Sequence, residues 1–122
     1  SEYYYITDDG NVDSVVEENH NLSKRRRAIG NIFKTQEEAE KYREYLKAKA
    51  IIKQDTKGFK PDWNNDDENK YLGFWDLDED KLDWLPRSIF IEATIHFKSK
   101  EDVEESFKKH PDEWKTYLTY EG

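Results

Sequence analysis

The stretch FKTQEEAE at residues 33–40 decides the fold prediction, because FKSKEDVE at residues 97–104 aligns with it without a gap. In each copy a hydroxyl residue, Thr35 or Ser99, precedes an acidic residue by three positions, which is the pattern of a helix N-terminus. Each copy also begins with a phenylalanine, Phe33 or Phe97, that ends a segment of β-type residues. The sequence therefore predicts a repeated strand-then-helix unit, and the alternative is two ordinary capped helices that each follow an aromatic strand end.

The segments around the two copies predict the remaining strands. Residues 2–7 and 12–17 flank the turn sequence DDGN and predict an N-terminal hairpin. Residues 71–77 and 82–85 predict a second hairpin, and the alternation of apolar and polar residues over 88–97 predicts a further strand. Residues 20–27 are polar and basic without a period, and we expect a loop there.

Helical spacing and end signals predict three helices. The first is expected to begin at Thr35, to end near Gln54 before Lys57-Gly58, and to bury the face formed by Ala39, Tyr42, Leu46 and Ala50. The second follows Ser99, and a short third helix begins at Pro111, since proline suits the first helical position. We therefore predict an α+β fold: an antiparallel sheet with two strand-then-helix units, helices on one face, and a short C-terminal helix.

Composition supports one folded domain over residues 1–122, with an acidic, insertion-like hairpin region at 61–85. The 122 residues are 15% aromatic, which favours a small aromatic core over disorder, although 39% are charged and the net charge is −8. No apolar run is long enough to cross a membrane, and no signal pattern begins the sequence. The absence of cysteine excludes disulfides and thiolate metal sites and favours a cytoplasmic location.

No pattern in the sequence predicts catalysis, a metal or a cofactor. The three histidines, His20, His96 and His110, lack the spacing of metal ligands. The acidic run from Asp76 resembles a calcium loop, but Lys81 stands where such a loop needs glycine. There is no glycine-rich phosphate loop and no nucleophile elbow. We therefore expect a protein that is not an enzyme.

Charge is distributed in blocks, and two of them are candidate binding surfaces. Residues 61–83 hold nine acids against two lysines, together with the aromatic residues Trp63 and Trp75. Aromatic residues with an acidic rim suit a basic groove of a partner protein. The candidate partner-binding residues are Asp62, Trp63, Asp66, Asp67, Glu68, Trp75, Asp76, Asp78 and Asp80. The alternative is a nucleic-acid-binding loop formed by Lys24, Arg25, Arg26 and Arg27. Both blocks are also compatible with ordinary solvated surface.

Three stretches resemble a group of small proteins encoded by phages, prophages and other mobile elements of bacteria. They are RAIGNIFKTQEEAE at 27–40, FKSKED at 97–102 and HPDEWK at 110–115. The resemblance covers most of the chain outside residues 61–85, and the group has no established activity that could be carried over to a site. It implies a small accessory protein of a mobile element, acting in the cytoplasm of a bacterial host.

That setting implies a first hypothesis for function. Small acidic phage proteins with aromatic patches often inhibit host machinery, as anti-CRISPR proteins and inhibitors of restriction nucleases do. We therefore expect a host protein as partner, such as a CRISPR-associated or restriction nuclease, bound through the acidic, aromatic surface. The alternatives are a nucleic-acid-associated accessory protein that uses residues 24–27, and a structural or regulatory interaction module of the phage. Direct binding of nucleic acid is less favoured, and no membrane partner is expected.

Overall fold

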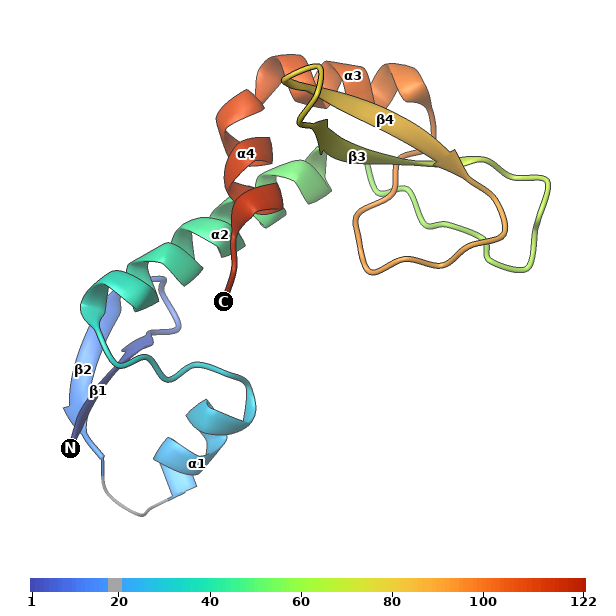
Figure 1. The fold of residues 1–122 in the computed structure, drawn as a ribbon. Helices are drawn as coiled ribbons and strands as arrows, with labels where there is room; N and C mark the ends of the chain where they lie inside the picture. The colour runs from blue at the N-terminus through green and yellow to red at the C-terminus, as the bar shows by residue number, and fades with distance from the viewer. Residues whose placement is uncertain (18–20) are drawn as a thin grey trace. The chain divides into compact units, whose positions relative to one another are not determined.

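The computed structural model describes residues 1–17 and 21–122, which form two compact units (Figure 1). One unit is Ser1–Leu46 together with Gly122, and the other is Lys47–Glu121. Each unit contains one antiparallel hairpin and helical segments, so the predicted α+β class is confirmed. The expectation of a single sheet is corrected, because the strands form two separate two-stranded sheets. A single cooperative domain over 1–122 stays a prediction.

The first unit is built on a hairpin of tyrosine-rich sequence. Strand β1 (Glu2–Ile6) pairs with β2 (Val12–Val16), and Gly10 takes a left-handed conformation in the connecting turn, with φ of 86°. The helix α1 (Asn21–Ala28) follows, where the sequence predicted a loop for 20–27. His20 lies outside the described residues. The loop prediction was wrong for 21–27 because α1 is attached by polar contacts, which leave no apolar period to detect.

The second unit contains a longer hairpin and two helices. Strand β3 (Lys70–Asp76) pairs with β4 (Lys81–Arg87), and the helices α3 (Lys100–Lys109) and α4 (Pro111–Thr119) follow. The strand predicted over 88–97 is absent, and only Phe97 forms a bridge there. Ile89, Phe90 and Ile91 are 63–73% exposed. The alternating pattern therefore did not produce a strand, because no partner strand lies beside this segment in the described structure.

The repeated stretch has the same local structure in both units. Phe33 forms an isolated antiparallel bridge with Tyr4 of β1, and Phe97 forms the same bridge with Tyr71 of β3. Each bridge consists of two backbone hydrogen bonds, at 2.8 and 2.9 Å in the first unit and 2.7 and 2.9 Å in the second. Each phenylalanine thus adds one residue of a third strand to its hairpin before the chain enters a helix.

Both predicted helix caps are confirmed. The Glu38 backbone N–H donates to Thr35 Oγ1 at 3.1 Å at the start of α2 (Gln36–Asp55), and the Asp102 N–H donates to Ser99 Oγ at 3.1 Å at the start of α3. The N–H of Lys34 donates back to the Glu38 carboxylate. The oxygens of Thr35 and Ser99 thus accept hydrogen bonds from backbone N–H groups of the first helical turn, which have no acceptor within the helix.

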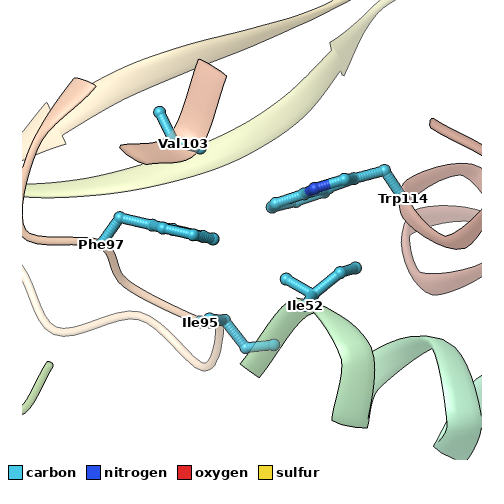
Figure 2. Close-up of a cluster of buried hydrophobic side chains, with 5 residues drawn as sticks. All are labelled: Ile52, Ile95, Phe97, Val103 and Trp114. Carbon is cyan, nitrogen blue, oxygen red and sulfur yellow. The ribbon is translucent and has the colours of Figure 1, made fainter. Parts of the chain in front are cut away.

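The core of the second unit is an aromatic cluster. Figure 2 shows Ile52, Ile95, Phe97, Val103 and Trp114 converging, and all five are at most 6% exposed. Trp114 lies against the rings of Phe97, Phe107 and Tyr117, with centroids 5.0–6.0 Å apart. A Cβ at Gly73 of β3 would meet both Trp114 and Phe107. Helices α3 and α4 therefore pack on the same face of this hairpin.

The buried face of α2 differs from the prediction. Ala39 is buried and Tyr42 half-buried, as expected, but Leu46 and Ala50 are exposed. In the second half of the helix, Ala48 and Ile52 are buried instead. The prediction assumed one continuous stripe, whereas α2 supplies residues to both compact units. Among the helices of residues 1–17 and 21–122, none is both long and apolar enough to cross a membrane.

Candidate functional site

The acidic block does not form one continuous surface, because β3 separates its two groups of carboxylates. One group, with Asp62, Asp66 and Asp67, lies in the loop before β3, and the other, with Asp78 and Asp80, lies in the turn after it. The seven residues of β3 span roughly 20 Å at about 3.3 Å per residue. Figure 1 shows the loop and the turn at opposite ends of the β3–β4 hairpin. We name these the loop end and the turn end.

At the loop end, Trp63 holds the loop together. Its ring lies edge-on to the His96 ring, with centroids 5.1 Å apart, and the Lys70 ammonium lies 4.7 Å from its centroid. Lys70 is fully buried, and its Nζ donates to the carbonyls of Asn65 and Glu68 at 3.1 and 2.9 Å. Glu68 also accepts from the Asp62 N–H at 3.0 Å. Trp63 and Glu68 therefore stabilise the loop, whereas Asp62, Asp66 and Asp67 are exposed.

His96 is the buried titratable group of this loop. Its Nε2 has no hydrogen-bond partner within the described residues, and the side chain is almost completely buried. Burial lowers the pKa of His96 below its ordinary value, and the nearby Lys70 and Lys53 charges act in the same direction, against the opposing effect of Glu92. The neutral imidazole is therefore the form that packs against Trp63.

At the turn end, one carboxylate is structural and three are free for a partner. Asp76 accepts hydrogen bonds from the N–H groups of Asp78 and Glu79, at 2.9 and 3.1 Å, and so fixes the turn. Asp78, Glu79 and Asp80 are exposed, and Asp80 has a left-handed backbone with φ of 54°, which aspartate tolerates better than most residues. The turn end therefore presents three carboxylates on a constrained backbone.

Two exposed apolar side chains lie beside these carboxylates. Trp75 is 37% exposed and Leu77 is 86% exposed. Together with Asp80 they form one wall of a groove of about 220 Å³, whose other wall is Lys115, Leu118 and Thr119 of α4. Leu118 also packs against the core of this unit. An apolar groove with an acidic rim is the combination expected of an anchor site for a partner protein.

The basic run is less available than the sequence suggested. Arg26 lies over the Tyr5 ring, 3.7 Å from its centroid, and donates to the Tyr3 hydroxyl at 2.9 Å. Arg27 pairs with Glu17. Lys24 and Arg25 are exposed on α1, and no described residue forms an ion pair with either. Of the four basic residues, two therefore hold α1 to the hairpin and two face solvent.

A buried polar network in the second unit contains a serine, a histidine and an aspartate. Ser106 Oγ donates to the Asp55 carboxylate at 2.6 Å, and His110 Nδ1 lies 2.7 Å from the same oxygen. The serine hydroxyl also accepts from Trp114 Nε1 at 2.8 Å and is 1% exposed. A nucleophile would need its hydroxyl free and directed at the histidine. The Ser106 hydroxyl is instead bonded to Asp55 and Trp114. We therefore interpret the network as a structural connection between the end of α2 and the helices α3 and α4.

Comparison of the chain with family models, with curated proteins and with solved structures finds no match. Within residues 1–17 and 21–122, no three acidic or histidine side chains converge as metal ligands would. The function is therefore inferred from the geometry of the chain itself.

Of the six residues that line the groove, sequence reasoning predicted Trp75 and Asp80 and missed Leu77, Lys115, Leu118 and Thr119. Leu77 had a detectable signal, since it is an apolar residue inside the acidic sequence Asp76 to Asp80. Leu118 and Lys115 had none, because only tertiary packing brings α4 beside the turn. The predicted set of nine residues is therefore divided: Trp63, Glu68, Asp76 and the exposed Asp62 hold local structure, and the exposed remainder lies at two separate ends of the hairpin.

Proposed function

We propose that this protein binds a basic host protein through the turn end, and that the partner is a nucleic-acid-handling protein whose action it inhibits. The observation that carries the proposal is a groove lined by exposed Trp75, Leu77 and Asp80, with exposed Asp78 and Glu79 in the same turn. Proteins that bind nucleic acid present basic grooves, and a carboxylate surface competes for them directly. An anti-CRISPR or anti-restriction role is the specific form of this proposal.

Electrostatics and apolar contact have different roles in the proposed complex. The net charge of −8 and the carboxylates of the turn end accelerate encounter with a basic surface, and salt slows this step by screening beyond about 8–10 Å. Trp75 and Leu77 exclude water after contact, so their loss mainly speeds dissociation. The two kinds of substitution are therefore separable by kinetics.

The test uses two charge reversals of equal size at opposite ends of the hairpin. Asp78→Lys with Glu79→Lys changes the turn end, and Asp66→Lys with Asp67→Lys changes the loop end by the same charge. The four side chains are exposed and accept no hydrogen bond in the described structure, so both variants are expected to fold. Bacteria with an active CRISPR or restriction system express each variant and are challenged with a targeted phage.

Wild type and the loop-end variant are expected to protect the phage, and the turn-end variant is expected to lose protection. Full protection by the turn-end variant would refute the proposal that the turn end is the contact surface.

The exposed pair Lys24 and Arg25 supports a second candidate function, binding of nucleic acid by α1. Lys24→Glu with Arg25→Glu tests it, because loss of activity in that variant alone would move the site to α1.

A further inference from the structure

Trp75 differs from the other three tryptophans in its surroundings. Trp63 has the Lys70 ammonium over its ring, at 4.7 Å from the centroid, and Trp84 has the Lys100 ammonium at 5.9 Å. Trp114 is fully buried among aromatic rings. Within the described part of the chain, no ring packs against Trp75 and no cation lies over its ring, although Lys115 lines the opposite side of the same groove. Its exposed indole is therefore available to a cation from outside the chain.

The groove that contains Trp75 has the size of one side chain. Pockets for drug-sized ligands or cofactors have volumes of about 300–1,000 Å³, and this groove has about 220 Å³. Its lining is the apolar surfaces of Trp75, Leu77 and Leu118, with the Asp80 carboxylate on the hairpin side and Lys115 and Thr119 on the α4 side. A long side chain with an apolar stem and a cationic head matches this lining.

We infer that the groove binds an arginine side chain of the partner, with the guanidinium stacked on Trp75 and paired with Asp80. Arginine fits better than lysine because its flat guanidinium stacks on indole, is weakly hydrated and pairs with a carboxylate through two N–H groups. Asp78 and Glu79 at the rim attract the same charge. The inference rests on the proposed function and names the chemistry that the partner presents.

The chain contains a related contact elsewhere, between an arginine and a tyrosine ring. The Arg26 guanidinium lies 3.7 Å from the centroid of the Tyr5 ring on the hairpin of the first unit, while it donates to the Tyr3 hydroxyl. An arginine stacked on a ring of a strand is thus compatible with this type of hairpin surface. At the turn end, Trp75 provides the ring and Asp80 the acceptor, and we infer that the partner provides the arginine.

The test titrates the full chain, labelled with ¹⁵N, with the peptide acetyl-Gly-Arg-Gly-Arg-Gly-amide at about 0.15 M salt, where long-range attraction is screened. The four indole N–H signals are recorded, and Trp75→Phe assigns that of Trp75. Matched peptides carry lysine or citrulline in place of arginine. We expect saturable shifts at Trp75, Leu77 and Leu118, at least fivefold weaker binding of the lysine peptide, and no binding of the citrulline peptide, which has the shape but no charge.

Three substitutions sharpen the result. Asp80→Asn keeps the size of the side chain and a residue that tolerates the left-handed backbone, and it is expected to weaken binding at least fivefold. Asp66→Asn removes the same charge at the loop end and is expected to leave binding unchanged. Lys115→Ala removes a like charge from the groove wall and is expected to tighten binding.

Equal binding of the arginine and lysine peptides, or shifts distributed outside the groove, would overturn the inference. Equal effects of Asp80→Asn and Asp66→Asn would overturn it as well, because simple charge attraction would then explain the binding. Failure here is distinguishable from failure of the proposed function. If the phage assay still requires Asp78 and Glu79 while the arginine peptide does not bind, the turn end binds a partner by other means.

Discussion

Gly73 lies in the middle of β3, and the substitution Gly73→Ala tests the packing of the second unit. A Cβ built at this position would lie 2.6 Å from two ring carbons of Trp114 and 2.9 Å from a ring carbon of Phe107. Ordinary contacts between carbon atoms are about 3.5–4.0 Å. The indole of Trp114 has no room to retreat, since it is fully buried against Phe97 and Tyr117.

Two opposing effects decide the sign of the change. A glycine inside a strand costs roughly 0.5–1 kcal/mol relative to alanine, so a strand with free space would be stabilised by Gly73→Ala. Inserting a methyl group into a packed core costs about 1–3 kcal/mol. Because the added carbon would overlap two rings by about 1 Å, we expect overpacking to dominate and the free energy of unfolding to fall by about 1–2 kcal/mol.

The measurement is urea unfolding of the full chain, followed by far-ultraviolet circular dichroism so that the tryptophans are not the probe. Trp114→Phe removes the ring carbons that the new methyl group meets. We therefore expect Gly73→Ala to cost less in the Trp114→Phe background than in the wild type. A stabilising Gly73→Ala, or strictly additive effects of the two substitutions, would refute this account of the packing.

Three further predictions concern stability. Thr35→Ala and Ser99→Ala are each expected to lower the free energy of unfolding by about 1 kcal/mol, measured in urea, because each removes the acceptor of a helix N–H. Ser106→Ala leaves Trp114 Nε1 buried without an acceptor and is expected to cost about 1–3 kcal/mol; an unchanged midpoint would contradict the network. Since burial lowers the pKa of His96, the unfolded chain takes up this proton first, and stability is expected to fall as pH drops below about 6.5 toward the folded-state pKa. His96→Gln should flatten that part of the pH dependence of unfolding, and an identical slope in both proteins would exclude His96 as its source.

The parts of the fold that sequence could predict depend on short-range signals. The repeat beginning at Phe33 and Phe97 correctly located two helix starts, since a cap is decided by a few neighbouring residues. The left-handed Lys57 and Gly58, with φ of 56° and 77°, likewise end α2 where predicted. The hairpins were located by their turn residues. These features need no knowledge of the rest of the chain.

The failures share a different cause. The helix α1 has no apolar stripe, because Ser23 and Arg26 attach it to β1 through the hydroxyl of Tyr3. The alternating segment 88–97 has strand-forming residues, but strands require a partner, and pairing is decided by tertiary structure. The split of the acidic block follows from the same limit, because sequence proximity placed Asp66 and Asp78 in one surface and β3 separates them.

The motif Gly30-Asn31-Ile32-Phe33, which leads into the first copy of the repeat, has a structural role. Gly30 takes a left-handed conformation with φ of 74°, and the Asn31 side chain then bonds to both the N–H and the carbonyl of Ile6, each at 2.8 Å. Phe33 pairs with Tyr4 on this edge of β1, and the Asn31 side-chain amide pairs with Ile6, two residues further along the same edge. These contacts explain Gly30 and Asn31 by their roles in folding, so we do not propose either residue as part of a binding site.

The two units share the parts that account for folding, and their differences bear on the proposed binding site. Both units share the bridge of Phe33 or Phe97 to a tyrosine and the capped helix that follows, and these common parts account for folding. The first hairpin also has an acidic turn, with exposed Asp8 and Asp9, but its connection, residues 7–11, contains no apolar side chain, and the described part of the first unit has no helix equivalent to α4. An exposed Trp75 beside three carboxylates is costly for a surface that serves folding alone, because apolar area remains in water. The groove beside Trp75 is a feature of the second unit alone, and it is there that we propose that a partner binds.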